Sequence, residues 1–409
     1  MLSALLARGG FALRGERLHS LPMSFDDISE ASLRRRHGAK WNQYGADVLP
    51  AWVADMDFVV AAPIRAALHA AVDAADLGYP QAPRATGLPQ LFATRVGERF
   101  GWTIDSRDVL ILSDVVQGLY LALETFSARG EGALIQTPIY PPFLHAAQET
   151  GRRAVCVPLS AGTTRYEIDF AALEDAIDAD TRLFMLCNPH NPSGRVFSRA
   201  ELVAIGELAC RHDLVIVSDE IHADLVLDEV PHIPIATIAP EVAARTITLM
   251  SASKAFNIAG LCMAFAHFGS HALKTRFERV PGHVRGGTNT LSIAAVRAAW
   301  SEAQPWLDEV LDQLRANRAR VAAFVAERWP RVGHFPPEAT YLAWLDLRAL
   351  ALAEPPHEYL LREAQVALND GRTFGPPGDG FVRLNFATSP ALLDTILARL
   401  DGALGPLAR

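Results

Sequence analysis

The sequence predicts an α/β protein with a large domain, built on a mostly parallel sheet covered by helices, and a smaller α/β domain. The segment Thr246–Met250 carries bulky residues on both faces, as strands do in a parallel sheet that helices cover on both sides. Helical segments alternate with further short apolar runs. With 409 residues and 50% hydrophobic content, the chain can bury a large core and divide into two domains.

Four segments follow from this reading. We expect residues 1–22 to be a disordered extension, because Arg8 interrupts the apolar part too early for a secretory signal. An organellar transit peptide is the alternative. Residues 23–60 are expected to contribute to the small domain, residues 61–305 to form the large domain, and residues 306–409 to complete the small domain, with a long helix at about 306–329 as the connection.

The overall charge and composition exclude several classes of function. A net charge of -8 argues against nucleic-acid binding, and the one basic cluster, at residues 34–40, is interpreted as a solvated turn. No apolar run is long enough for a membrane span. The four cysteines are widely spaced, which predicts reduced thiols of a cytoplasmic protein, without disulfides or a metal cluster.

The N-terminal third contains two segments with candidate site residues. Trp52 and Asp57 lie in an irregular segment and are predicted to form a pocket wall that contacts the substrate, although they could equally be a core anchor and a helix cap. A helix at 63–75 leads to the sharp loop that contains Tyr79, and another helix follows at 88–100.

Several predicted strands end at polar or aromatic residues. A strand at 109–112 precedes a helix at 115–126, whose N-terminus suits an anionic phosphate. The strand at 133–137 presents Tyr140, which could stack on a flat ring or pack under the loop. The strand at 183–187 leads into a rigid loop with Asn191, and the strand at 214–217 is followed by Asp219, which needs a positive partner there.

Lys254 follows the strand Thr246–Met250 and is the central candidate of the sequence. Burial would lower its pKa and favour the neutral amine, which can form a Schiff base with an aldehyde cofactor. Ser251 and Ser253 could hold a phosphate beside it. A surface lysine after a core strand is the alternative. Ligands of such sheets bind at the carboxyl ends of the strands, so we expect these residues to share one crevice.

Arg383 lies inside an apolar strand predicted at 381–386, and another strand of the same domain is predicted at 341–347. A guanidinium in this position must meet an anion, and a substrate carboxylate fits its two parallel donors. A structural ion pair is the alternative.

Four motifs together resemble fold-type I enzymes that depend on pyridoxal 5'-phosphate (PLP), within the class I/II aminotransferase superfamily. They are Asn191-Pro-x-Gly194, Ser218-Asp219-Glu-Ile-His222, Ser251-x-Ser-Lys254 and Arg383-Leu-Asn. The segments Trp52-Val-Ala-Asp-Met-Asp-Phe58, Lys254-Ala-Phe-Asn-Ile-Ala-Gly-Leu261, Glu338-Ala-Thr-Tyr-Leu-Ala-Trp344 and Leu368-Asn-Asp-Gly371 further resemble the MalY/PatB-type cystathionine β-lyases. The resemblance implies an aspartate-aminotransferase-like fold.

The resemblance also implies roles around the cofactor ring. Lys254 would be the Schiff-base lysine and the base that takes the Cα proton. Asp219 would pair with the pyridine nitrogen. Asn191 and His222 would contact the ring hydroxyl, and Tyr140 would stack on the ring.

The phosphate and the substrate have their own implied contacts. Backbone N–H groups of Val116 and Gln117 and the hydroxyls of Ser251 and Ser253 would bind the phosphate, together with Tyr79 from the second subunit of a homodimer. Arg383 would bind the substrate carboxylate. The loop before the phosphate helix reads Ser113-Asp114, where related enzymes often have Thr-Pro-Gly, and Cys262 replaces an arginine common in aminotransferases.

The implied reaction is β-elimination from L-cystathionine or another cysteine S-conjugate, giving a thiol, pyruvate and ammonia. An aminotransferase with the same residues is the closest alternative, and a regulatory partner-binding protein on the same scaffold is another. No metal is expected.

Overall fold

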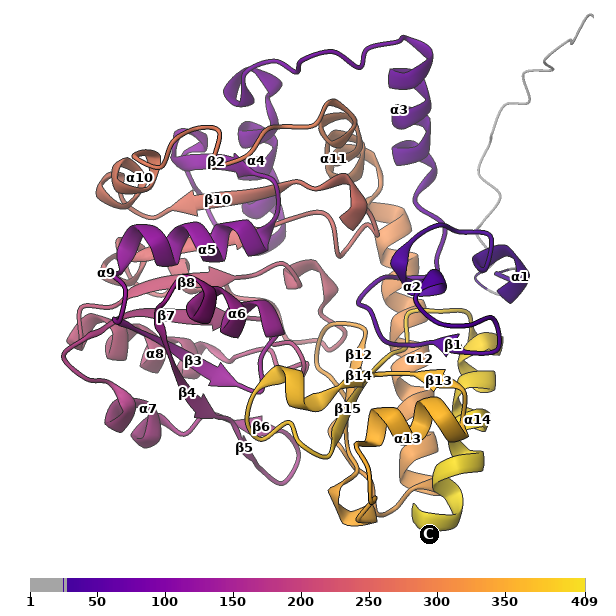
Figure 1. Cartoon of the computed structure of the whole chain (residues 1–409). Helices are drawn as coiled ribbons and strands as arrows, with labels where there is room; N and C mark the ends of the chain where they lie inside the picture. Colours follow the sequence, from indigo (N-terminus) through magenta and orange to yellow (C-terminus); the bar gives the residue numbers. More distant parts are fainter. Residues whose placement is uncertain (1–24, 26–27, 409) are drawn as a thin grey trace, which may run out of the picture.

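The computed structural model describes residue 25 and residues 28–408. The extension expected at residues 1–22 lies outside these residues. The described residues form a seven-stranded sheet, a four-stranded sheet, two short two-stranded sheets and the surrounding helices (Figure 1).

The larger sheet has seven strands, of which six run parallel. Their order is β2 (Val109–Leu112), β10 (Ala264–Phe268), β9 (Thr246–Met250), β8 (Val215–Asp219), β7 (Thr181–Cys187), β3 (Gly132–Thr137) and β4 (Arg153–Pro158). β10 runs in the opposite direction to the other six and pairs antiparallel with both β2 and β9. The mostly parallel sheet is therefore confirmed. Neither β4 nor β10 was predicted; β4 is a partly exposed edge strand, so it lacks the continuous apolar run of the others.

Helices cover both faces of this sheet (Figure 1). In β3, Ile135 packs into an apolar cluster with residues of α5 (Val115–Phe126), α6 (Pro141–Glu149) and α10 (His271–Glu278). The next residue back, Leu134, packs into a second cluster with α7 (Phe170–Ala176), α8 (Arg199–Arg211) and α9 (Pro240–Ala243). Successive side chains of a strand point to opposite faces, so one buried strand serves both layers.

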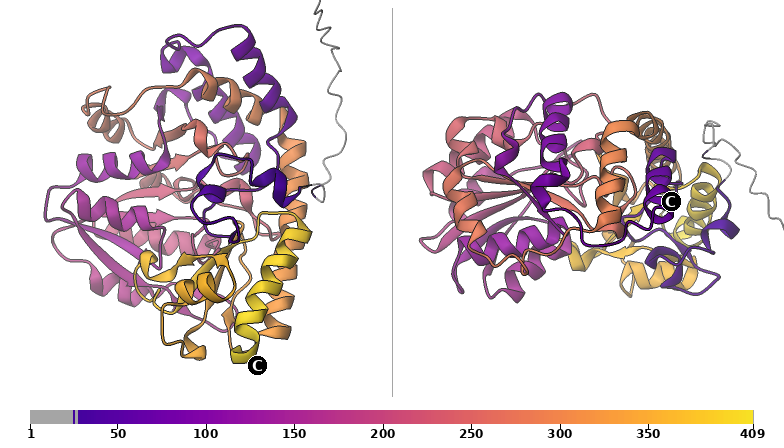
Figure 2. Two further views of the ribbon diagram at one scale, coloured as in Figure 1. Left: turned by 45° about the vertical axis from the view of Figure 1, so that its right-hand side comes forward. Right: turned by 90° about the horizontal axis from the view of Figure 1, so that it is seen from above.

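Three helices form a group beside β2 and β10, in the upper part of Figure 1. They are α3 (Ala62–Asp73), α4 (Leu88–Phe100) and α11 (Thr290–Glu302), with α3 packed along α11. The long helix α12 (Gln304–Arg328) then runs down to the smaller sheet and lies beside the C-terminal helix α14 (Pro390–Ala408), as the left-hand view in Figure 2 shows.

The smaller sheet is antiparallel. Its order is β11 (Gly333–His334), β12 (Leu342–Asp346), β15 (Phe381–Asn385) and β14 (Asn369–Asp370), with α13 (Pro356–Glu363) packed nearby. The N-terminal segment joins this part, because β1 (Leu49–Pro50) pairs in parallel with β13 (Val366–Ala367). All seven strands of the large sheet fall within 61–305 and all four of this sheet within 306–409; the domain boundaries themselves stay a prediction.

Candidate functional site

A pocket opens at the carboxyl ends of the parallel strands and gathers residues from distant parts of the chain. The expected members that line it are Val116, Tyr140, Asn191, Asp219, His222, Ser251, Ser253 and Lys254. Others are Ala54, Asp114, Cys187 and Cys262. The strand-end residues therefore lie together, because parallel strands all deliver their ends to the same edge of the sheet.

Lys254 reaches across to the N-terminal segment. Its Nζ donates a hydrogen bond of 2.9 Å to the carbonyl oxygen of Ala54, and the hydroxyl of Tyr341 donates to the same oxygen, also at 2.9 Å. Burial lowers the pKa of Lys254 below its ordinary value, with the nearby Arg383 acting in the same direction and the carboxylates of Asp55 and Asp219 opposing it. The lysine is thus held in place and biased toward the neutral, nucleophilic amine.

Asp219 is the last residue of β8 and is buried. Burial raises the pKa of its carboxyl to about 7, partly offset by the N–H of Ile221, which donates to Oδ1 at 3.0 Å. Within the described residues it forms no ion pair at 4.0 Å or less. A cationic partner in the pocket would restore its charged form.

His222 is 2% exposed, and burial lowers its pKa to about 3, so the ring is neutral at physiological pH. Its Nδ1 is buried and has no hydrogen-bond partner in the described part of the chain. A buried polar atom without a partner is costly, and a ligand bound in this pocket would supply the partner that Nδ1 lacks.

Arg383 of β15 is 3% exposed and meets only neutral acceptors. Its Nη1 donates to Oδ1 of Asn191 at 2.8 Å, and its Nη2 donates to Oδ1 of Asn369 at 2.6 Å and to the carbonyl oxygen of Trp52 at 3.2 Å. Its Nε has no partner among the described residues, and no carboxylate there pairs with it. Burial lowers its pKa to about 10, so it stays charged at neutral pH. The alternative of a structural ion pair finds no support.

The expected phosphate region is partly occupied by the protein itself. Asp114 caps α5, and its Oδ1 accepts the N–H of Gln117 at 2.7 Å; Gln117 does not line the pocket. The hydroxyl of Ser251 donates to the carbonyl oxygen of Met263 at 2.6 Å and accepts the N–H of Ser253 at 3.0 Å. Val116 and Ser253 are the better placed of the predicted phosphate contacts.

Asp57 and Trp52 lie outside the residues that line the pocket. Asp57 is 1% exposed, and its carboxylate accepts from Nε1 of Trp41 at 2.8 Å and pairs with Nζ of Lys40 at 2.9 Å. The interpretation of residues 34–40 as a solvated turn is wrong for Lys40, which is buried. Asp57 has the contacts of a structural residue, and Trp52 reaches the site through its carbonyl oxygen.

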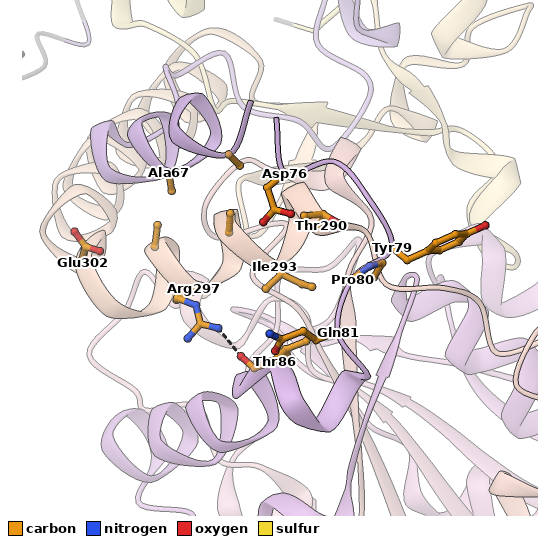
Figure 3. A pocket seen from close by; sticks show the side chains of 13 residues that line it. Ala67, Asp76, Tyr79, Pro80, Gln81, Thr86, Thr290, Ile293, Arg297 and Glu302 are labelled. Carbon is orange, nitrogen blue, oxygen red and sulfur yellow. Dashed lines mark hydrogen bonds between the residues drawn. The ribbon is translucent and has the colours of Figure 1, made fainter. Parts of the chain in front are cut away.

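Tyr79 is fully exposed in the loop after α3. This loop borders a second pocket between α3 and α11, also lined by Gln81, Thr86 and Arg297. Figure 3 shows the Tyr79 ring pointing away from the other labelled residues of that pocket. Tyr79 therefore makes no contact with the Lys254 pocket of its own chain, and its predicted phosphate contact stays a prediction.

Three contributors were not identified as site residues from the sequence. The Ala54 carbonyl, the Tyr341 hydroxyl and the Asn369 amide each lie in a segment whose resemblance was noted, yet their roles depend on contacts across the chain. The segment motifs were the only signal of them.

The pocket fits PLP. It offers a lysine amine for an aldehyde, a buried carboxyl that lacks a cation and a histidine nitrogen that lacks a partner. The chain belongs to the aminotransferase class I and II family, whose model matches residues 55–400.

Individual proteins and solved structures are also similar to this chain over most of its length. Cystathionine beta-lyase PatB of Bacillus subtilis (strain 168) is 36% identical over 390 residues, covering 93% of this chain and all of that protein. The crystal structure of OvoB matches with a TM-score of 0.88 and 39% identity, covering 93% and 99% of the two chains. The PLP-bound C-S lyase from Staphylococcus hominis matches with a TM-score of 0.88 and 30% identity over the same shares.

Proposed function

We propose that the protein is a PLP-dependent carbon–sulfur β-lyase that cleaves L-cystathionine or related cysteine S-conjugates to a thiol, pyruvate and ammonia. The observation that carries this proposal is that the site contains two features together. The pKa of Lys254 is lowered, which favours its neutral amine, and the charged Arg383 has no carboxylate partner among the described residues. An α-amino acid carries the carboxylate that Arg383 lacks. The relative PatB and the Staphylococcus hominis protein, named as lyases of this type, support the choice of reaction.

The residues that would hold PLP follow from the pocket. Asp219 would meet the pyridine nitrogen, Asn191 and His222 the ring hydroxyl, and Tyr140 the ring face, while Val116 and Ser253 would meet the phosphate. When bound, the cofactor supplies an electron sink for charge that develops at Cα. The protein supplies orientation and proton transfer.

Two actions belong to the chain itself, and the departure of the leaving group follows from them. Arg383 holds the substrate carboxylate and so fixes the Cα–H bond relative to Lys254. The neutral amine of Lys254 removes the Cα proton at its Nζ. The thiolate then leaves from Cβ with little assistance, because the conjugate acid of a cysteine-type thiolate has a pKa near 8.5.

The test is a paired assay on purified, PLP-loaded protein. L-Cystathionine is supplied without any keto acid, and pyruvate, ammonia and free thiol are followed together. Sustained formation of all three is expected, and Lys254→Ala should abolish it. Turnover that requires an added keto acid and yields no thiol would identify an aminotransferase instead, and turnover retained by Lys254→Ala would remove Lys254 from catalysis.

We also propose that two copies form a homodimer in which Tyr79 reaches the phosphate of the partner's site. The support is that Tyr79 is exposed together with the large apolar side chains of Val72, Leu77 and Val284. The loop at 77–80 lies against residues 288–291, with the Thr290 hydroxyl donating to the Gly78 carbonyl oxygen at 3.1 Å. Exposed apolar groups of this kind mark interfaces.

Mixed dimers test this arrangement. Tyr79→Ala and Lys254→Ala chains are each expected to be impaired as homodimers. When they are mixed, one site of each mixed dimer combines an intact Lys254 from one chain with an intact Tyr79 from the other. Activity per dimer is measured, and the mass in solution establishes the oligomeric state. Hybrid sites that regain activity support sharing between chains. A monomeric, active protein would contradict it.

A cytoplasmic location is the remaining proposal. Cys156, Cys187, Cys210 and Cys262 are all free thiols, as expected in a reducing compartment. Among the described residues, no helix is long and apolar enough to cross a membrane. Activity recovered in the cytosolic fraction of cells is the expected result, and activity in a secreted or membrane fraction would contradict the proposal.

A further inference from the structure

The N-terminus of α5 carries a negative charge at the place where the cofactor phosphate is expected. Asp114 is exposed, lines the Lys254 pocket and is the N-cap of the helix. An N-terminal helix end favours anions because its first N–H groups are unpaired and its dipole is positive there. The carboxylate of Asp114 already takes this favourable position.

The available donors at this end are correspondingly few. The N–H of Gln117 donates to Oδ1 of Asp114 at 2.7 Å, and the N–H of Ser113 donates to Oε1 of Gln117 at 2.9 Å. The Gln117 amide is in turn fixed by a 3.1 Å hydrogen bond from its Nε2 to the Val284 carbonyl oxygen. Two N–H groups near the pocket are thus used by the chain's own side chains, which leaves those of Val115 and Val116 for an anion.

The pocket lining offers few positive charges that could compensate the negative charge of Asp114. Among the described residues that line it, Lys254 is the only lysine or arginine, whereas Asp114 and Asp219 are both acidic. With PLP bound as proposed, Lys254 would meet the aldehyde end of the cofactor and Asp219 its pyridine nitrogen. The phosphate would then face Asp114 without an opposing cation from these residues; Cys262 lines the same pocket and carries no positive charge.

We propose that Asp114 opposes the phosphate of PLP, so that the enzyme binds its cofactor less tightly than the same pocket with a neutral cap would, and in a manner that depends on pH and salt. The inference rests on the proposed function only in taking PLP as the ligand. A phosphate monoester gains its second negative charge near pH 6, so the repulsion grows as pH rises through this region. The carboxylate is exposed, so added salt should screen the effect.

The experiment measures the dissociation constants of apoenzyme for PLP and for pyridoxal, which lacks the phosphate, by absorbance and by quenching of tryptophan fluorescence. Asp114→Asn keeps an oxygen that can accept the Gln117 N–H but removes the charge. Asp169→Asn is the matched control, because Asp169 caps α7 by accepting the Ala172 N–H at 2.9 Å and does not line the pocket. Asp114→Ser is a second neutral cap if the asparagine variant is unstable.

The expected result at low salt and pH 8 is a PLP dissociation constant about three- to ten-fold lower in Asp114→Asn, as for loss of one screened like-charge contact. The difference should shrink at pH 5.5 and in 0.5 M salt, and neither pyridoxal binding nor Asp169→Asn should change. An unchanged or weaker affinity for PLP, or an equal change for pyridoxal, overturns the proposal. Wild-type protein that binds neither compound would overturn the cofactor assignment itself.

Discussion

The Nη1 of Arg383 lies 2.8 Å from Oδ1 of Asn191, a residue 192 positions earlier in the chain. This hydrogen bond joins β15 of the small sheet to the loop after β7 of the large one. It places the proposed carboxylate-binding group beside the proposed cofactor ring. The proposed substrate site therefore lies where residues of the two sheets meet.

Replacing Arg383 by lysine should weaken substrate binding while the cofactor remains bound. Lysine keeps the charge but loses the planar pair of donors, so KM should rise about ten- to hundred-fold, as expected for loss of a charge-assisted hydrogen bond. Steady-state kinetics and the cofactor absorbance together check this. Arg320→Lys, on the exposed face of α12 where Arg320 pairs with Asp394, is the control. An unchanged KM would remove Arg383 from substrate binding.

Asp219→Asn should stabilise the cofactor-free protein at high pH. Burial raises the folded-state pKa of this carboxyl to about 7, above the ordinary value of 3.8, so the folded state binds the proton more tightly than the unfolded state. The contribution of Asp219 to the free energy of unfolding therefore falls as pH rises from about 4 to 7, because the ionised carboxylate is costly to bury. The melting temperature of the variant apoprotein should be roughly 2–5 °C above wild type at pH 8, and equal to it near pH 4.

Bound PLP should reverse the order of the melting temperatures of wild type and Asp219→Asn. A cationic pyridine nitrogen would compensate the buried charge of Asp219, so wild-type protein should gain more thermal stability from PLP than the asparagine variant does. Melting curves with and without saturating PLP measure the two gains. Equal gains would mean that Asp219 does not meet the pyridine nitrogen.

Asp57→Asn distinguishes a structural role from the predicted contact with substrate. It removes the charge of a buried pair with Lys40, and breaking such a pair costs about 3 kcal/mol. Chemical denaturation should show this loss, with KM of the folded variant within about twofold of wild type. A large increase in KM at unchanged stability would restore Asp57 to the substrate site.

The strand-end residues were predictable from the sequence because their placement follows from local pattern and sheet geometry. Buried strands such as Thr246–Met250 can be identified by their continuous apolar residues, and the carboxyl ends of parallel strands meet at one edge of the sheet. Tyr140, Asn191, Asp219 and Lys254 accordingly line one pocket. The resemblance of their motifs then pointed to the family.

Contacts between distant segments were decided only by the tertiary structure. Nothing local marks the Ala54 carbonyl as the acceptor for Lys254, or Lys40 as the buried partner of Asp57. The same holds for Asp114, whose carboxylate caps α5 and becomes notable because it also lines the pocket. The sequence by itself determined which reactive groups each strand delivers. Their burial and their partners, and so their charge states, were set by packing between segments that can lie as far apart as Ala54 and Lys254, for which the chain carries no periodic signal.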